Sequence, residues 1–154
     1  MKATKQKPRT TTKIINKLAA VDRDYAISSE SLAEALKRTK SAAKDAGVGV
    51  NELIGMVTAI KEITGREVSV VGNSLKTILT RLSRQSVVYK LFDLGIVVTD
   101  ENWARLRPFD LLISIAKSFK KLSKPNQQQV LELGAGVFML TEFKVLLSTL
   151  DKTY

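Results

Sequence analysis

The stretch VVGNSLKTILTRLSR, residues 70–84, decides the fold class of this chain. Its apolar side chains recur every three or four residues, a spacing that places them on one face of an α-helix. These positions are Val71, Leu75, Ile78, Leu79 and Leu82. Because polar residues such as Lys76, Thr80, Arg81 and Arg84 occupy other positions, the stretch predicts an amphipathic helix with one buried face.

The same spacing returns on both sides of this stretch. It predicts further helices over residues 13–24, 28–46, 50–64, 87–94 and 108–122, then one that follows Ser123 and a last one that reaches Leu150. Gly47, Gly65 and Gly95 stand where helices end, and Pro125 lies just inside the helix that Ser123 caps. The chain is therefore predicted to be all-α, a multi-helix bundle of seven or eight short helices.

Three glycines inside apolar stretches carry separate predictions. Gly55 lies in the interior of the predicted helix 50–64, where glycine costs about 1 kcal/mol relative to alanine, so we expect a neighbouring helix to pack closely there. Gly134 and Gly136 form a GxG, but it lacks the preceding strand and the third glycine of a phosphate-binding loop. We expect them only to break the helix.

The helical spacing fails over residues 96–107. Three β-branched residues, IVV, are followed by the turn-forming residues TDEN. Both a small hairpin and an ordered loop fit this pattern. We expect Trp103 and Leu106 to anchor the segment to the core.

The first residues differ in composition from the rest. Residues 1–12 combine lysine, arginine, threonine and glutamine without an apolar period, which predicts a basic flexible arm. Residues 13–154 then form the helical domain, and the segment near residue 96 suggests subdomains 13–85 and 86–154.

The absence of histidine and cysteine excludes the common catalytic and metal-binding arrangements. Ser-His-Asp and Cys-His triads, imidazole ligands and cysteine zinc sites all need one of these residue types. The nearest acidic pairs, Asp22 with Asp24 and Asp100 with Glu101, lie in turns or at helix boundaries rather than opposite each other. We therefore predict no enzyme activity, no metal and no cofactor.

The net charge of +10 favours an acidic partner. Two groups of cations are candidate contacts for an anion or a partner protein. The first contains Lys76, Arg81 and Arg84, and the second contains Lys117, Lys120, Lys121 and Lys124. Nonspecific contact with DNA is one interpretation, because phosphate neutralisation requires only cations. Sequence-specific recognition is disfavoured, since no helix-turn-helix pattern appears and aromatic residues are few. Attachment to a membrane ranks below both.

Four stretches carry a family resemblance: YAISSESLAEAL at 25–36, SAA at 41–43, GVGVNELIGMVTAI at 47–60 and VGNSLKTILTRL at 71–82. Together they resemble the core region of phage tail tape measure proteins. Short landmarks follow in the family's order, at residues 94–96, 106–109 and 122–123. The most recognisable run contributes Gly72, Asn73, Leu75, Lys76 and Arg81 as family motif positions.

This resemblance implies a structural role in a phage or prophage tail. Tape measure proteins act as the scaffold and ruler around which the tail tube polymerises. The implied partners are the tube protein, the tail assembly chaperone and further copies of the chain, in the host cytoplasm during assembly and then in the virion tail. A chain of 154 residues reaches only roughly 230 Å even when fully helical, so it is either a fragment of a ruler or a free-standing relative. The alternative function is that of a sequence-nonspecific nucleic-acid-binding helical domain.

Overall fold

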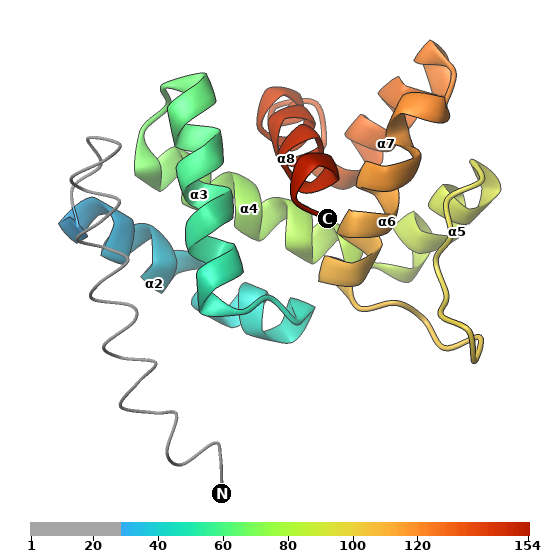
Figure 1. Cartoon of the computed structure of the whole chain (residues 1–154), viewed down its shortest axis with the longest axis horizontal. Helices are drawn as coiled ribbons and strands as arrows, with labels where there is room; N and C mark the ends of the chain where they lie inside the picture. The colour runs from blue at the N-terminus through green and yellow to red at the C-terminus, as the bar shows by residue number, and fades with distance from the viewer. Residues whose placement is uncertain (1–28) are drawn as a thin grey trace, which may run out of the picture.

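The computed structural model describes residues 29–154 and confirms the predicted all-α fold (Figure 1). Across these residues it contains seven α-helices, one short 3₁₀ helix and no strand. The helices are α2 (Ser29–Ala46), α3 (Val50–Thr64), α4 (Val68–Leu82), α5 (Gln85–Asp93), α6 (Pro108–Ser118), η1 (Phe119–Lys121), α7 (Lys124–Ala135) and α8 (Leu140–Thr153). The predicted arm 1–12 and helix 13–24 lie outside the described residues.

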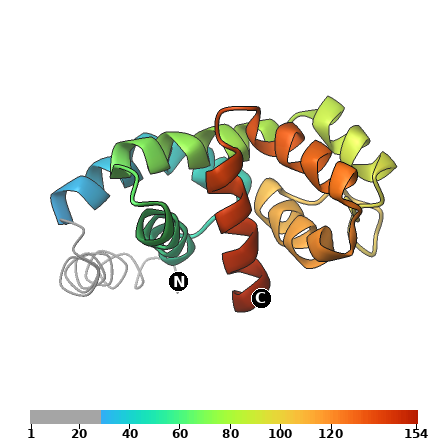
Figure 2. The same ribbon diagram turned by 90° about the horizontal axis from the view of Figure 1, so that it is seen from above.

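Helix α4, the one predicted first, lies at the centre of the packing. It contacts α2, α3, α5, α6, α7 and α8. Figure 2 shows it along one side of the molecule, with α3 and α8 on its inner side. Its predicted apolar face is buried throughout, and each large side chain that leaves water contributes about 1.5–3 kcal/mol to folding. The predicted start at residue 70 was two residues late, because the helix begins at Val68.

Small residues allow α2 to cross close to α4. A Cβ atom at Gly72 would lie 3.4 Å from the Cα and Cβ atoms of Ala35, which is van der Waals contact, so the two helices cross closely at this point. Thr39 of α2 is also fully buried, and its hydroxyl donates to the carbonyl oxygen of Ala35 at 2.9 Å. The motif glycine is therefore a packing residue.

Helix α8 closes the core by contacting α3, α4, α6 and α7. Its residue Phe143 is fully buried, and a Cβ atom at Gly134 would lie only 2.3 Å from the Cε2 atom of that ring. Helix α7 continues through Gly134 and ends at Ala135, so the expectation that Gly134 breaks the helix was wrong. The predicted break is confirmed at Gly136, whose φ is +70°.

The expectation of close helix packing at Gly55 was wrong. This residue is exposed, and no heavy atom lies within 4 Å of the position that its Cβ would take. It borders a shallow groove between α3 and α8, with Met56 and Tyr154 among the lining residues. Sequence spacing placed Gly55 correctly inside a helix, but it did not reveal which neighbours that position has.

Residues 96–107 form an ordered loop. A single antiparallel bridge joins Thr99 and Arg105, and no strand follows from it. Ile96 and Val98 are buried, and the expectation that Leu106 packs against the core is confirmed. The matching expectation for Trp103 was wrong, because its side chain is 85% exposed. The buried apolar residues at the base anchor the loop in its place.

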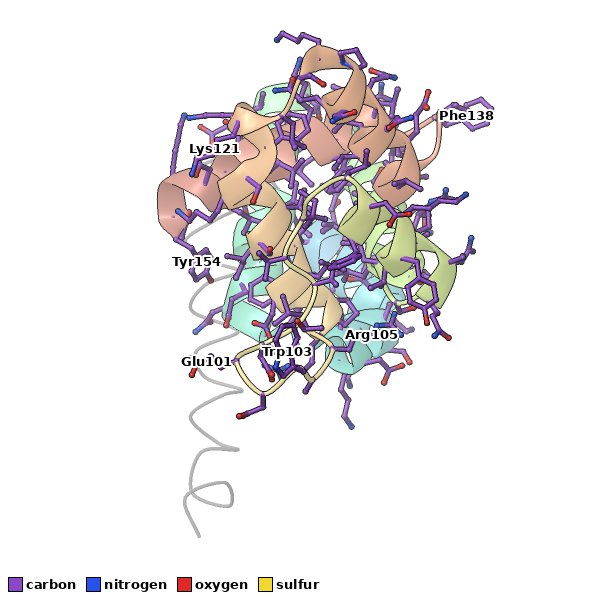
Figure 3. The ribbon with its side chains drawn as sticks, turned by 90° about the vertical axis from the view of Figure 1, so that its right-hand side faces the viewer. Glu101, Trp103, Arg105, Lys121, Phe138 and Tyr154 are labelled. Atoms are coloured by element: carbon purple, nitrogen blue, oxygen red, sulfur yellow. The ribbon has the colours of Figure 1, made fainter. Side chains whose placement is uncertain are left out.

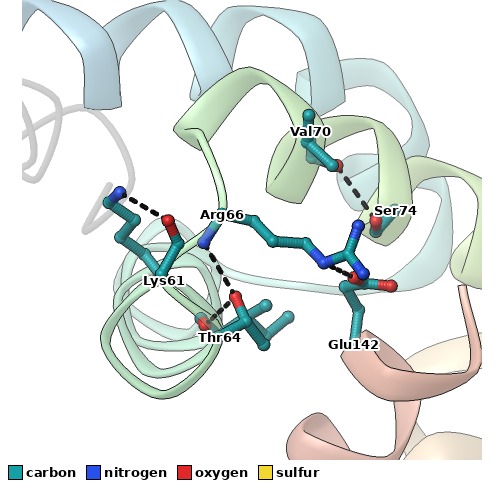
Figure 4. Close-up of polar contacts among 8 residues, drawn as sticks. Lys61, Thr64, Arg66, Val70, Ser74 and Glu142 are labelled. Atoms are coloured by element: carbon teal, nitrogen blue, oxygen red, sulfur yellow. Dashed lines mark hydrogen bonds and ion pairs between the residues drawn. The ribbon is translucent and has the colours of Figure 1, made fainter.

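A partly buried ion pair joins the α3–α4 turn to α8 (Figure 4). The Nε atom of Arg66 lies 2.6 Å from Oε1 of Glu142, whose side chain is 1% exposed. The contact is ionic, since Glu142 Oε1 accepts no hydrogen bond from any described residue. A buried carboxylate without a partner would carry a large desolvation cost. Arg66 therefore stabilises the position of α8 against α3 and α4.

Candidate partner-binding surfaces

Four lysines gather where α6 ends and α7 begins, and we refer to Lys117, Lys120, Lys121 and Lys124 as the lysine cluster. All four are exposed, and Figure 3 shows Lys121 at one end of the molecule. Lys117 lies in the last turn of α6, where the free carbonyls of the helix favour cations. The predicted group of cations is thus close together in the fold.

Asp151 of α8 neutralises part of the lysine cluster. Lys120 Nζ lies 3.1 Å from Asp151 Oδ2, and Lys117 Nζ lies 3.6 Å from Oδ1. The hydrogen bond from Lys120, with a smaller contribution from Lys117, lowers the pKa of Asp151 below its ordinary value. Lys121 and Lys124 have no ion pair with any side chain between residues 29 and 154, so they are the members that remain available to a partner.

The other predicted group of cations, Lys76, Arg81 and Arg84, lies apart from the lysine cluster. Arg81 Nε donates to the carbonyl oxygen of Leu133 at 2.9 Å, and Nη2 donates to that of Glu132 at 3.2 Å. Arg81 therefore closes the C-terminal end of α7, while Lys124 lies at its start. Twelve helical residues span roughly 18 Å, which separates the two groups.

The remaining members of the predicted group and of the family motif divide between packing and exposure. Leu75 is fully buried, and Gly72 lies at the crossing with α2. Asn73, Lys76 and Arg84 are exposed. Two of the five motif residues, Gly72 and Leu75, therefore contribute to the packing of α4, whereas Asn73 and Lys76 lie outside the core.

The acidic pair in the loop has a structural environment. Asp100 Oδ1 accepts hydrogen bonds from the backbone amides of Asn102 and Ala104 at 2.8 and 3.0 Å. Such bonds hold a turn together. Glu101 is exposed beside it. No three acidic residues within the described range come close enough together to hold a metal ion.

The two most exposed aromatic side chains of the described residues were not predicted. Trp103 is 85% exposed and Phe138 is 89% exposed, and Figure 3 shows them at well-separated places on the molecule. Phe138 follows the turn at Gly136 and precedes the apolar spacing of α8, which is the signal that could have placed it outside the core. Trp103 follows the turn-forming residues of the loop.

A groove of about 450 Å³ lies between α5 and α7. It is lined by Lys90, Asp93, Leu94, Gln129, Glu132 and Leu133. Its charged residues carry both signs and face an open surface, so the groove offers contact area and no convergent reactive groups.

None of the helices in residues 29–154 has the length and apolar character needed to cross a membrane. The described part of the chain thus combines a continuous helical core with charged and aromatic groups on its surface. These features define the described part of the chain as an all-α helical module.

Comparison with known proteins then identifies the family. The family described as phage-related minor tail protein matches residues 1–133, and the chain belongs to it. No solved structure matches the chain. Membership of this family supports a structural role in a phage tail, a location in the virion tail and contact with other tail components.

Proposed function

We propose that this chain is a tape-measure-like scaffold module of a bacteriophage or prophage tail, around which tube protein assembles. The observation that carries the proposal is the family match over residues 1–133. The ordered motifs of α2, α3 and α4 support the narrower tape-measure assignment, since they follow the order found in that family. The tail assembly chaperone is a second partner in this proposal, and assembly takes place in the host cytoplasm.

The lysine cluster is the proposed contact for an acidic surface of the tube protein. Lys121 and Lys124 are exposed and unpaired within the described residues, whereas Lys117 and Lys120 share Asp151. Attraction between exposed charges steers association and falls off within roughly 10 Å at 0.1 M salt. The contact is therefore expected to be strongest at low ionic strength.

Co-purification with the tail tube protein from the same genome tests this proposal. We expect the wild-type chain to retain the tube protein at low salt, and the variant carrying Lys121→Glu and Lys124→Glu to lose at least about tenfold in affinity. The matched control carries Lys40→Glu and Lys44→Glu on α2, which reverses the same number of exposed charges elsewhere. If the wild-type chain fails to bind the tube protein at low salt, the proposal is wrong.

The net charge of +10 supports nonspecific binding of nucleic acid as the alternative function. A gel-shift titration against salt separates the two functions, because each phosphate contact releases counterions. Steep salt dependence together with retained binding at about 150 mM salt would favour the alternative.

A further inference from the structure

The tip of loop 96–107 presents the chain's single tryptophan to solvent. Trp103 has a φ of +63°, a left-handed conformation that is rare for a bulky residue and costs of order 1–3 kcal/mol. It is the only non-glycine residue with positive φ between residues 29 and 154. The fold therefore holds this side chain outward at an energetic cost.

Backbone hydrogen bonds close the tip around Asp100. The amide of Trp103 donates to the carbonyl oxygen of Asp100 at 3.0 Å, and the amide of Asp100 donates to the carbonyl oxygen of Ala104 at 2.8 Å. The Asp100 side chain adds its two bonds to the amides of Asn102 and Ala104. The tip consists of residues 101–104: Asn102, Trp103 and Ala104 each bond to Asp100, and Glu101 follows it directly.

Further bonds hold the base of the loop to the helices. Ser114 of α6 donates to the carbonyl oxygen of Val97 at 2.7 Å, and the guanidinium of Arg105 donates to the carbonyl oxygen of Ser83 after α4. The conformation that presents Trp103 is consequently formed before any partner arrives. A preformed contact binds with a smaller loss of conformational entropy than a loop that must become ordered.

Charges of opposite sign flank Trp103. Figure 3 shows Glu101 on one side of the tryptophan and Arg105 on the other, and both are exposed. A rotation of 180° about an axis through Trp103 would exchange the two sides. Glu101 of each copy would then lie opposite Arg105 of the other copy. Two equivalent pairs form in this way, as a symmetric contact between identical surfaces requires.

We propose that Glu101 and Trp103 of this tip, together with the exposed Arg105 beside it, form a self-association site at which two copies of the chain meet across a two-fold axis. The two indoles pack against each other at the centre, and the two Glu101–Arg105 pairs lie at the rim. Glu101 disfavours phosphate or anionic lipid as the occupant, because it would repel either one. The contact is small, so the dimer is weak and depends on concentration.

Sedimentation of the full chain from about 1 μM to about 1 mM tests the proposal, since weak dimers dissociate in this range. We expect a monomer–dimer equilibrium, and a shift of the tryptophan emission to shorter wavelength as the dimer forms. Trp103→Ala should weaken dimerisation about thirtyfold. The control Phe138→Ala, which removes an aromatic side chain of similar exposure elsewhere, should leave it unchanged.

Charge exchange tests the two-fold pairing itself. Glu101→Arg and Arg105→Glu should each abolish the dimer, because like charges then face each other at both rim positions. Arg105→Glu also removes the hydrogen bond to Ser83, so an unchanged tryptophan emission of its monomer is required to show that the loop keeps its conformation. An equimolar mixture of the two variants should dimerise again, since both pairs in the mixed dimer have opposite charges.

Three outcomes would overturn the proposal: a monomer at every concentration, a dimer that Trp103→Ala leaves intact, or a mixture of charge variants that stays monomeric. The inference is independent of the proposed tail function. If the chain does not dimerise but still binds the tube protein, the self-association proposal is wrong and the proposed tail function is unaffected.

Discussion

Gly134 has no side chain because the ring of Phe143 occupies the space beside it. The ring is fully buried between helices, so it has no alternative position into which it could move. Gly55 lies in the opposite situation, with open space where a side chain would be. We therefore expect alanine to lower the free energy of unfolding at Gly134 and to raise it at Gly55.

We predict that Gly134→Ala destabilises the protein by about 1–3 kcal/mol, the usual cost of overpacking a core. The added methyl group would lie 2.3 Å from Phe143 Cε2, so helix α7 or the ring must shift. Urea unfolding followed by circular dichroism measures the change in the free energy of unfolding.

Gly55→Ala is the matched control for this substitution. It adds the same methyl group to a helix interior without a steric contact, and it should stabilise the protein by about 0.5–1 kcal/mol. Equal effects of the two substitutions would show that the helix propensity, and not the Phe143 ring, determines the cost at Gly134.

At the scale of the elements, Asp151 joins α8 to the end of α6 and to η1. Its carboxylate contacts Lys117 and Lys120, and its backbone carbonyl oxygen accepts a hydrogen bond from Lys117 at 2.9 Å. The hydrogen bond to the backbone carbonyl does not depend on the protonation of the Asp151 side chain, whereas the two ion pairs require its carboxylate to be charged. This difference makes one part of the helix contact dependent on pH.

We predict that Asp151 stabilises the protein at neutral pH and that this contribution is lost in acid. The hydrogen bond from Lys120 lowers the pKa of the folded carboxylate, so the folded state binds its proton less readily than the unfolded state. The stabilisation is therefore complete above the unfolded pKa and disappears as the pH falls through the folded pKa.

Urea unfolding of the wild-type chain and of Asp151→Asn across this pH range measures the contribution. The difference in stability should be present at neutral pH, shrink in acid and decrease in high salt, because the ion pairs are exposed and are screened. A difference that is the same at every pH would assign the effect to the carbonyl contact alone.

At the scale of the whole molecule, α4 joins the two segments that the sequence suggested as subdomains. It belongs to the first segment, yet it contacts α6, α7 and α8 of the second. Helix α3 also contacts α8, and Arg66 pairs with Glu142. Separation of the segments would expose these apolar faces and leave a buried carboxylate without its partner.

We predict that fragments 1–85 and 86–154 do not fold alone. Each should show reduced helical circular dichroism and poorly dispersed amide resonances, since each lacks half of the core around α4. An equimolar mixture should recover the helical signal, because the same surfaces can meet again. Independent folding of either fragment would instead establish the subdomains.

Several candidate site residues were predicted as groups because their grouping depends on local spacing. Lys117, Lys120, Lys121 and Lys124 follow one another closely at a helix end, so they lie together in any all-α fold. Their partial neutralisation by Asp151 was not predicted, because that residue comes from another helix. Arg81 was predicted as an exposed cation, but carbonyls more than fifty residues away along the chain accept its hydrogen bonds.

The sequence by itself determined where helices form, which face of each is apolar and where most of them end. These properties depend on the spacing of apolar residues and on glycine, serine and proline at the ends, all within one or two helical turns. Only the tertiary structure decided that the Phe143 ring packs against Gly134, that no residue packs against Gly55 and that Trp103 points into solvent. The reason is that each of these outcomes depends on which distant segment occupies the adjacent space, and the spacing of residues within one helix carries no information about that neighbour.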